Sequence, residues 1–259
     1  MLAETIKQKL AAKQPSIGTW MTMAHPSIAE LLAMAGYDWV VIDTEHSAVD
    51  VSQVFQMIIA IENKGAVPLV RLAGIDPIQA KAVLDSGAAG VIVPMVNTKA
   101  DAELAVSMTK FPPMGRRGVG LARAQGYGMN FDDYIKRNNQ DSLLIVQIEH
   151  IDAVNNIDEI LSVPGIDGTF IGPYDLSLSL GVAGQLSHPS VEAAKEKVLK
   201  AALKKGLAAG LHIVQPVTAV DEYKAAIKAG YTFIAVGADN LFMRDGSRDL
   251  YSNIQKLKG

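Results

Sequence analysis

Eight short apolar runs alternate with longer amphipathic stretches from one end of the chain to the other. The runs are rich in β-branched residues and apolar at successive positions, which is typical of parallel strands that helices cover on both faces. They occupy residues 17–20, 39–42, 67–70, 91–93, 143–146, 168–171, 208–211 and 233–236. This number of units in 259 residues predicts an α/β fold, a (β/α)₈ TIM barrel that spans 1–259 as a single domain.

Residues that begin and end helices fall between these runs. Glycines follow several of the predicted helices, as expected of the residue just past a helix carboxyl terminus. They are Gly36, Gly87, Gly206 and Gly230. Asp50 and Gln53 form a capping-box pattern, and Asp76 is an N-cap residue followed by Pro77 at the first helical position. The first unit carries no Gly-x-Gly-x-x-Gly, which argues against a dinucleotide-binding sheet.

Composition argues against several classes of protein. The 27 acidic and 24 basic residues are spread along the chain and leave a net charge of -3, so nucleic acid is not an expected partner. Cysteine is absent, which leaves only oxygen or imidazole ligands for any metal. The amino terminus has an early acid, Glu4, and no segment reaches the roughly 20 apolar residues of a membrane span. We expect a soluble cytoplasmic protein without a membrane partner.

The connection after the fourth strand, from 97 to 142, is much longer than the other connections. It contains a helix-like stretch, then Pro112-Pro113 and Arg116-Arg117. Loops of this length are usually functional lids or disordered, and the arginines here favour a lid. We therefore expect a long insertion at this point, and an amphipathic last helix over 249–257.

Two carboxylates stand just past neighbouring strands, at the ends where parallel-sheet enzymes build their sites. Glu149 follows an almost fully apolar run, and Asp175 follows the next run after a rigid Gly172-Pro173 corner. The alternative is a pair of solvated loop acids, but charge at a buried strand end is costly unless it is ligated. With oxygen ligands the fitting ions are Mg²⁺ or Mn²⁺, with Co²⁺ or Zn²⁺ as further candidates.

Other strand-end residues suggest acid-base chemistry. His46 lies in the segment 43–46, which directly follows the second run, and is a candidate general base, although a lone histidine is more often structural. Arg71 ends the third run, where an anion clamp is more plausible than a helix-capping surface residue. No lysine ends a predicted strand, which disfavours a Schiff-base mechanism.

Four segments together resemble the HpcH/HpaI aldolase family of class II, metal-dependent pyruvate aldolases. They are DTEH at 43–46, GRRGVG at 115–120, VQIE at 146–149 and FIGPYDLS at 170–177. The resemblance runs from about residue 17 to residue 240 in the same order and spacing. It implies 4-hydroxy-2-oxoheptanedioate, 2-keto-3-deoxyrhamnonate or 2-dehydro-3-deoxyglucarate aldolase activity, and a homohexamer with exchanged carboxyl-terminal helices.

The resemblance also implies residue roles. Glu149 and Asp175 would hold the metal, and pyruvate would contact Gln147 and the backbone around Tyr174 and Asp175. His46 would accept the proton. Tyr174 stands where the family often has a small residue.

Two more roles follow from the same resemblance. Arg71 would stabilise the enolate-like transition state. Asp85 matches an acid that raises the basicity of the histidine. Because Asp85 lies in the last helical turn before Gly87, at the far end of its helix, it can reach a site only from a neighbouring subunit, or not at all.

The leading hypothesis is reversible cleavage of a 4-hydroxy-2-oxo acid to pyruvate and an aldehyde. One alternative is a metal-dependent lyase of the citrate-lyase β or malyl-CoA type, which acts on acyl-CoA thioesters. The other is a non-catalytic barrel that binds 2-oxo acids as a sensor, against which the presence of both the base and the arginine argues. The aldehyde, the preferred metal and the stereochemistry do not follow from the sequence.

Overall fold

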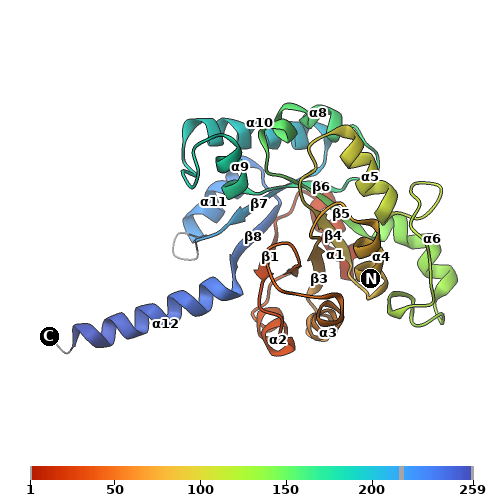
Figure 1. The fold of residues 1–259 in the computed structure, drawn as a ribbon, viewed down its shortest axis with the longest axis horizontal. Helices are drawn as coiled ribbons and strands as arrows, with labels where there is room; N and C mark the ends of the chain where they lie inside the picture. The colour runs from red at the N-terminus through yellow and green to blue at the C-terminus, as the bar shows by residue number, and fades with distance from the viewer. Residues whose placement is uncertain (1, 216–218, 258–259) are drawn as a thin grey trace.

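A closed parallel barrel forms the centre of the molecule (Figure 1). The computed structural model describes residues 2–215 and 219–257, and within them eight parallel strands pair in chain order, with the last strand against the first. The strands are β1 (Ser16–Met21), β2 (Trp39–Asp43), β3 (Val67–Arg71), β4 (Gly90–Val93), β5 (Leu143–Ile148), β6 (Gly168–Ile171), β7 (Ala208–Ile213) and β8 (Phe233–Ala238). The predicted (β/α)₈ barrel is confirmed.

Helices surround the barrel on its outer face (Figure 1). They are α1 (Leu2–Ala11), α2 (Pro26–Met34), α3 (Val51–Glu62), α4 (Pro77–Asp85), α5 (Lys99–Thr109), the 3₁₀ turn η1 (Arg123–Gln125), α6 (Phe131–Asp141), α7 (Ile151–Asn155), α8 (Ile157–Ile160), α9 (Pro173–Ser179), α10 (Pro189–Lys205), α11 (Ala219–Ala229) and α12 (Asp239–Lys256). The predicted caps are present, because Asp50 and Gln53 form a capping box and the Asp76 carboxylate accepts from the Ile78 amide.

Most strand positions are apolar because the strands contribute to two cores. Along β2, Val40 and Ile42 pack against the helices, whereas Trp39 and Val41 point into the barrel. Successive side chains of a strand point to opposite faces, so a strand buried on both faces needs an unbroken apolar run. Inside the barrel Trp39 stacks on Phe233 with ring centroids 4.1 Å apart.

The long connection between β4 and β5 does not cover the mouth of its own barrel. It packs at the opposite end, where Arg117 is buried and forms an ion pair with Asp85 at 2.7 Å. Lys110, also buried, donates to the Ser142 carbonyl at 2.7 Å just before β5. The lid interpretation is therefore wrong for this chain's own mouth, since these long-range contacts hold the segment at the amino-terminal end of the strands.

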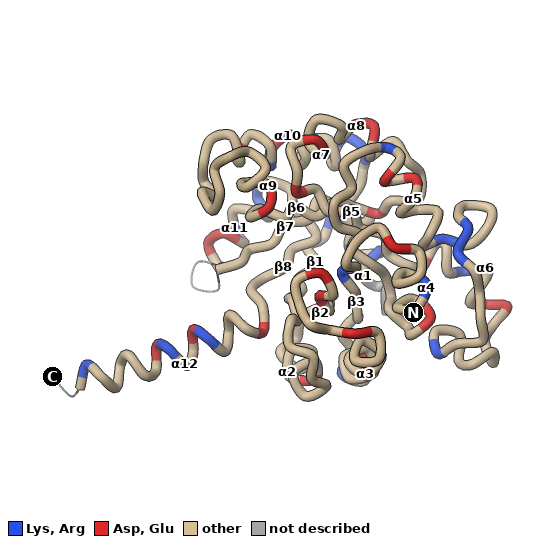
Figure 2. Tube along the Cα trace, viewed as in Figure 1, with Lys and Arg blue, Asp and Glu red and all other residues tan. Residues whose placement is uncertain are grey.

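The carboxyl-terminal helix α12 runs away from the barrel instead of packing beside α11 (Figure 1). Its main contacts are with β1 and β8, at its first turn. There the buried Asp239 carboxylate accepts from the amides of Thr22 and Met23 at 2.8–3.0 Å. Acidic and basic residues are interspersed along this helix and along those around the barrel (Figure 2). Among the described helices, none has the length and apolar character needed to cross a bilayer.

Candidate active site

A cavity of about 240 Å³ opens at the carboxyl ends of the strands. The fold brings most of the predicted site residues to it, although they are far apart in the chain. Those that line it are His46, Arg71, Gln147, Tyr174 and Asp175. Glu149 lies directly beside them, because the Gln147 side-chain amide donates to its carboxylate. Six of the seven predicted site residues therefore lie in or beside one cavity.

Glu149 is the most enclosed of the predicted residues that carry a charge, with only 2% of its surface exposed. Its Oε1 accepts from the Met95 amide at 2.8 Å, and its Oε2 accepts from Gln147. Met95 adopts a left-handed backbone conformation with φ of 53°, a strained state for a residue with a side chain, and its amide thereby reaches the carboxylate. The Glu149 side chain is thus fixed in place by β5 and by the loop that follows β4.

Gly172 allows α9 to begin close to Glu149. A Cβ at this position would lie 2.9 Å from Glu149 Oε2, closer than real Cβ contacts come, and 3.3 Å from Gln147 Nε2, a tight contact. Pro173 then starts the helix, and Asp175 falls in its first turn. The Gly172-Pro173 corner therefore delivers the second carboxylate to the cavity that Glu149 borders.

The residues present fit a divalent metal ion. Among residues 2–215 and 219–257, no basic side chain forms an ion pair with Glu149, and the Gln147 carbonyl oxygen Oε1 is buried without a hydrogen-bond partner. A buried carboxylate without a cation is costly, and a divalent ion held by Glu149 and Asp175 would compensate it. Within the same ranges no cluster of three or more acidic or histidine ligands occurs, so further ligands would be water and substrate oxygens.

Arg71 is held as a two-pronged donor at the mouth. Its Nε and Nη2 donate to the two oxygens of Asp43 at 3.0 and 2.6 Å, and its Nη1 lies 2.9 Å from Glu45 Oε2. The guanidinium also lies 4.5 Å from the centroid of the Trp20 ring, a cation–π contact. Arg71 is buried, so the interpretation as a helix-capping surface residue is wrong.

Glu45 shows how negative the mouth is. Burial, chiefly, raises the pKa of its carboxyl to about 7; the Arg71 charge opposes this rise, and Glu149, Asp43 and Asp175 reinforce it. Its contact with Arg71 is an ion pair without hydrogen-bond alignment, since Oε2 has no hydrogen-bond partner. Several carboxylates facing one another with a single arginine create a field that favours a bound cation.

His46 stands at the rim of the cavity. Its side chain is 61% exposed, and its Nε2 lies 3.9 Å from Glu45 Oε2. The Asp43 carboxylate accepts from the amides of Glu45 and His46 at 2.9 and 3.3 Å, which fixes the loop that carries the imidazole. An imidazole in this place can exchange protons with solvent and with a molecule in the cavity.

Asp85 is the predicted residue that the fold does not bring to the mouth of its own barrel. It ends α4 at the amino-terminal end of the strands, and its Oδ1 lies 2.7 Å from Arg117 Nη2. The same Arg117 nitrogen donates to the Tyr134 hydroxyl at 3.1 Å. Within one chain, Asp85 therefore anchors the long connection.

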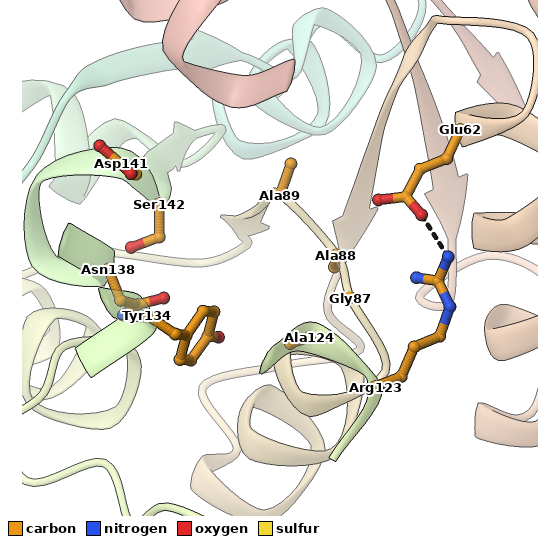
Figure 3. Close-up of a pocket in the computed structure, with 10 residues that line it drawn as sticks. All are labelled: Glu62, Gly87, Ala88, Ala89, Arg123, Ala124, Tyr134, Asn138, Asp141 and Ser142. Carbon is orange, nitrogen blue, oxygen red and sulfur yellow. Dashed lines mark hydrogen bonds and ion pairs between the residues drawn. The ribbon is translucent and has the colours of Figure 1, made fainter. Parts of the chain in front are cut away.

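A cavity of about 280 Å³ lies at that end of the barrel (Figure 3). Arg123 and Glu62 pair across one wall, with Tyr134 on the other side. Ala89 and Ser142, which also line it, directly precede β4 and β5. Because barrel enzymes carry their chemistry at the carboxyl ends of the strands, the smaller mouth cavity is the candidate active site.

Some residues of the mouth were not singled out from the sequence, Trp20 and His212 among them. Trp20 lies beneath Arg71, and His212 lines the cavity from β7. Both lie near the carboxyl end of an apolar run, as the predicted site residues do. The position at a strand end could therefore have identified them from the sequence. His212 lies one residue past the run predicted for the seventh strand, which extends to Ile213 in the structure.

A family model and named relatives match most of the chain. The model of the HpcH/HpaI aldolase/citrate lyase family matches residues 16–245. A 5-keto-4-deoxy-D-glucarate aldolase of Escherichia coli (strain K12) is 38% identical over 251 residues, which cover 96% of each chain.

Solved structures resemble the chain over nearly its whole length. An HpcH/HpaI aldolase/citrate lyase family protein from Burkholderia cenocepacia J2315 is 35% identical with a TM-score of 0.91, covering 97% of this chain and 99% of that one. The HpcH/HpaI aldolase from Desulfitobacterium hafniense DCB-2 is 30% identical with a TM-score of 0.90, covering 96% of each. The chain belongs to the HpcH/HpaI aldolase/citrate lyase family, as its four motifs predicted.

Proposed function

We propose that the protein is a divalent-metal-dependent aldolase that reversibly cleaves a 4-hydroxy-2-oxo acid to pyruvate and an aldehyde. The observation that carries this proposal is the buried Glu149 carboxylate, which has no basic partner among the described residues. It lies beside Gln147, at the same mouth as Asp175 and Arg71. Membership of an aldolase family supports the reaction class. The enzyme is then a carbon–carbon lyase.

Glu149 and Asp175 would hold Mg²⁺ or Mn²⁺, with Co²⁺ or Zn²⁺ as further candidates, and the ion would supply Lewis-acid polarisation of the 2-oxo acid. Gln147 and the backbone around Tyr174 and Asp175 would bind the pyruvate half and orient it. Trp20 and Phe170 line the same cavity with ring centroids 5.6 Å apart, and would pack against that half and exclude water from it.

His46 would remove the proton from the C4 hydroxyl of the substrate, directly or through one water. The C3–C4 bond then breaks and the aldehyde leaves. The electron pair of the broken bond passes into the enolate of pyruvate. Arg71 would stabilise the negative charge on the enolate oxygen, because its fork is already oriented by Asp43. A proton returned to the former C3 carbon completes pyruvate.

An aldolase is favoured over an acyl-CoA lyase. Coenzyme A carries phosphates, which basic residues at the rim would be expected to bind. Among the described residues, Arg71 is the only lysine or arginine that lines the cavity, and Asp43 and Glu45 already engage it. We propose the relatives' substrate class, 5-keto-4-deoxy-glucarate and similar 4-hydroxy-2-oxo acids, as the first to test.

The protruding helix α12 supports assembly into a homo-oligomer. Leu250, Tyr251 and Ile254 are exposed on it, and apolar groups on a free helix gain stability when another copy covers them. We propose the hexamer with exchanged carboxyl-terminal helices that the family resemblance implies, in which Asp85 could act only at a neighbour's mouth. Light scattering on the full chain tests the mass of the assembly.

One experiment separates the functions. Metal-stripped protein would be mixed with a panel of 4-hydroxy-2-oxo acids, with and without added Mn²⁺, and pyruvate release would be followed. Release that requires the metal supports the aldolase. Cleavage of malyl-CoA without pyruvate release would favour the acyl-CoA lyase, and binding of pyruvate without turnover of any substrate would favour the sensor.

A further inference from the structure

Met95 forms a left-handed corner between β4 and α5. In the part of the chain that the structure describes, three residues other than glycine have a positive φ, namely Lys13, Met95 and Tyr127. The amides of Lys13 and Tyr127 donate to nearby backbone carbonyls at 3.0 and 2.8 Å. The Met95 amide donates instead to the buried carboxylate of Glu149, at 2.8 Å. The strain at this corner therefore accompanies a contact with a charged side chain.

The residues that follow Met95 hold this conformation. Val96 is fully buried in the core around the barrel, and Thr98 with Asp101 forms the capping box that begins α5. A residue with a side chain stays in the left-handed region only where its surroundings over-determine it. The Met95 side chain itself is 45% exposed, so packing of the methionine is not what fixes the corner.

The two oxygens of Glu149 have different surroundings. Oε1 faces the Met95 amide, whereas Oε2 accepts from Gln147 and lies on the side of Gly172, where a Cβ would come within 2.9 Å of it. Gly172 directly precedes α9, whose first turn carries Asp175. Because each carboxylate oxygen has two lone pairs, Oε2 can accept from Gln147 and also bind an ion. An ion shared with Asp175 would therefore meet Oε2.

We propose that Met95 is a positioning residue that makes Glu149 a monodentate ligand and thereby favours Mg²⁺ and Mn²⁺ over Ca²⁺. Mg²⁺ demands compact octahedral geometry, whereas Ca²⁺ takes more oxygens at longer distances and often binds a carboxylate through both of its oxygens. With Oε1 held at the Met95 corner, Glu149 contributes one oxygen, which suits the smaller ions. This inference rests on the proposed function, because it assigns an ion selectivity to the proposed metal site.

An ester at position 95 removes the donor and keeps the side chain. The α-hydroxy acid analogue of methionine, incorporated there in the full chain, replaces the N–H by an oxygen atom. The matched control is the corresponding ester at Tyr127, where φ is 55° against 53° at Met95 and the amide bond that is lost also measures 2.8 Å but ends on a backbone carbonyl. Met95→Leu is a second control, because it changes the side chain and keeps the N–H.

The measurement is the affinity of each metal-stripped protein for Mn²⁺ and for Ca²⁺ by titration calorimetry. We expect the preference for Mn²⁺, expressed as the ratio of the two dissociation constants, to fall about tenfold or more in the Met95 ester. Loss of a group that orients a metal ligand typically costs about 10–100-fold in affinity, and a released carboxylate can turn to the bidentate mode of Ca²⁺.

The controls separate the amide from the side chain and from a general loss of stability. In the Tyr127 ester and in Met95→Leu the ratio should stay within about threefold of the parent. An unchanged ratio in the Met95 ester would overturn the proposal. A fall of equal size in either control would also overturn it, since the Met95 amide would then not be the cause.

Hydrogen exchange of the Met95 amide in the parent protein tests the same contact without a variant, and so decides the matter even where the ester does not fold. The amide should exchange no faster with Mg²⁺ than without it, because monodentate ligation leaves its bond to Oε1 in place. Faster exchange on addition of Mg²⁺ would overturn the proposal. Failure of the parent protein to bind either Mn²⁺ or Mg²⁺ would instead overturn the metal site on which the proposed function depends.

Discussion

Asp43 and Arg71 occupy paired positions on β2 and β3, and the arginine fork meets both oxygens of the Asp43 carboxylate at 3.0 and 2.6 Å. Strand register alone places the two residues side by side, so the pair needs no loop to form it. The aspartate orients the guanidinium while Nη1 remains directed to Glu45 and the mouth. Arg71 is thus held ready for a developing negative charge.

Replacing the Arg71 guanidinium by a lysine ammonium should impair the chemical step. Arg71→Lys keeps the charge but loses the planar donors, so kcat for aldol cleavage should fall by about 10²–10³-fold, with a smaller change in KM. Steady-state kinetics on a correctly assembled variant provides the measurement. An unchanged kcat would mean that Arg71 only supports packing around Trp20.

The exposed imidazole at the rim should act as the base. His46→Ala should lower kcat for cleavage by about 10²–10⁴-fold, the usual contribution of a positioned acid-base group, and pyruvate binding should be largely retained. Turnover and methyl-proton exchange are both measured. If both proceed at the parental rate, another group, with Glu45 the nearest acidic candidate, is the base.

The corner at Gly172 should be sensitive to a single methyl group. The backbone there has φ of -90° and ψ of 92°, which alanine adopts without strain, but its Cβ would lie 2.9 Å from Glu149 Oε2. Gly172→Ala should therefore displace the carboxylate and weaken Mn²⁺ binding about 10–100-fold, the range seen when a group that orients a metal ligand changes.

Titration calorimetry with Mn²⁺ measures this effect, and Gly74→Ala is the matched control. A Cβ at Gly74 meets no atom within 4 Å, so metal binding should be unaffected there. Parental affinity in Gly172→Ala would show that Glu149 does not hold the ion in the position that the structure gives it.

Lys110 makes stability depend on pH. Burial, chiefly, lowers the pKa of its ammonium from 10.5 to about 8 in the folded state, although Asp167 opposes the change. Above pH 8 the folded protein gives up this proton before the unfolded chain does. The unfolding free energy should therefore rise between about pH 8 and about pH 9.5, on the order of 1–2 kcal/mol.

Denaturant unfolding across that interval, compared with Lys110→Met, measures the contribution. The variant should lose the rise, whatever its stability at neutral pH. The interval ends below pH 10 because burial raises the pKa of Tyr231, and tyrosines of this kind lower stability at higher pH. An equal rise in both proteins would assign it to other groups.

The barrel could be predicted because its evidence is local. A strand buried on both faces, such as β2, requires an apolar residue at every position, and the residue after such a run has to lie at the mouth. Glu149, Arg71 and His46 were found by that rule. Their partners on neighbouring strands were harder to assign, because the pairing of Asp43 with Arg71 depends on strand register, which the apolar runs alone do not specify.

Long-range packing explains the features that the sequence did not predict. The connection after β4 was expected to be a lid, but the ion pair between Arg117 and Asp85 holds it at the other end of the barrel. No local pattern encodes that contact, since its two residues are far apart in the chain. The outward course of α12 is similar, because an amphipathic helix does not reveal which surface it will pack against.

The central claim is that Glu149 and Asp175 hold a catalytic divalent ion. Glu149→Gln removes one charge from the site with little change in volume. The direct measurement is Mn²⁺ binding together with pyruvate release. Both are compared between this variant and exhaustively chelated parent protein. The account predicts that the variant stays folded, binds Mn²⁺ at least about tenfold more weakly and loses metal-dependent cleavage, as the chelated parent does. Full activity of the parent with its metal content verified as nil would contradict it.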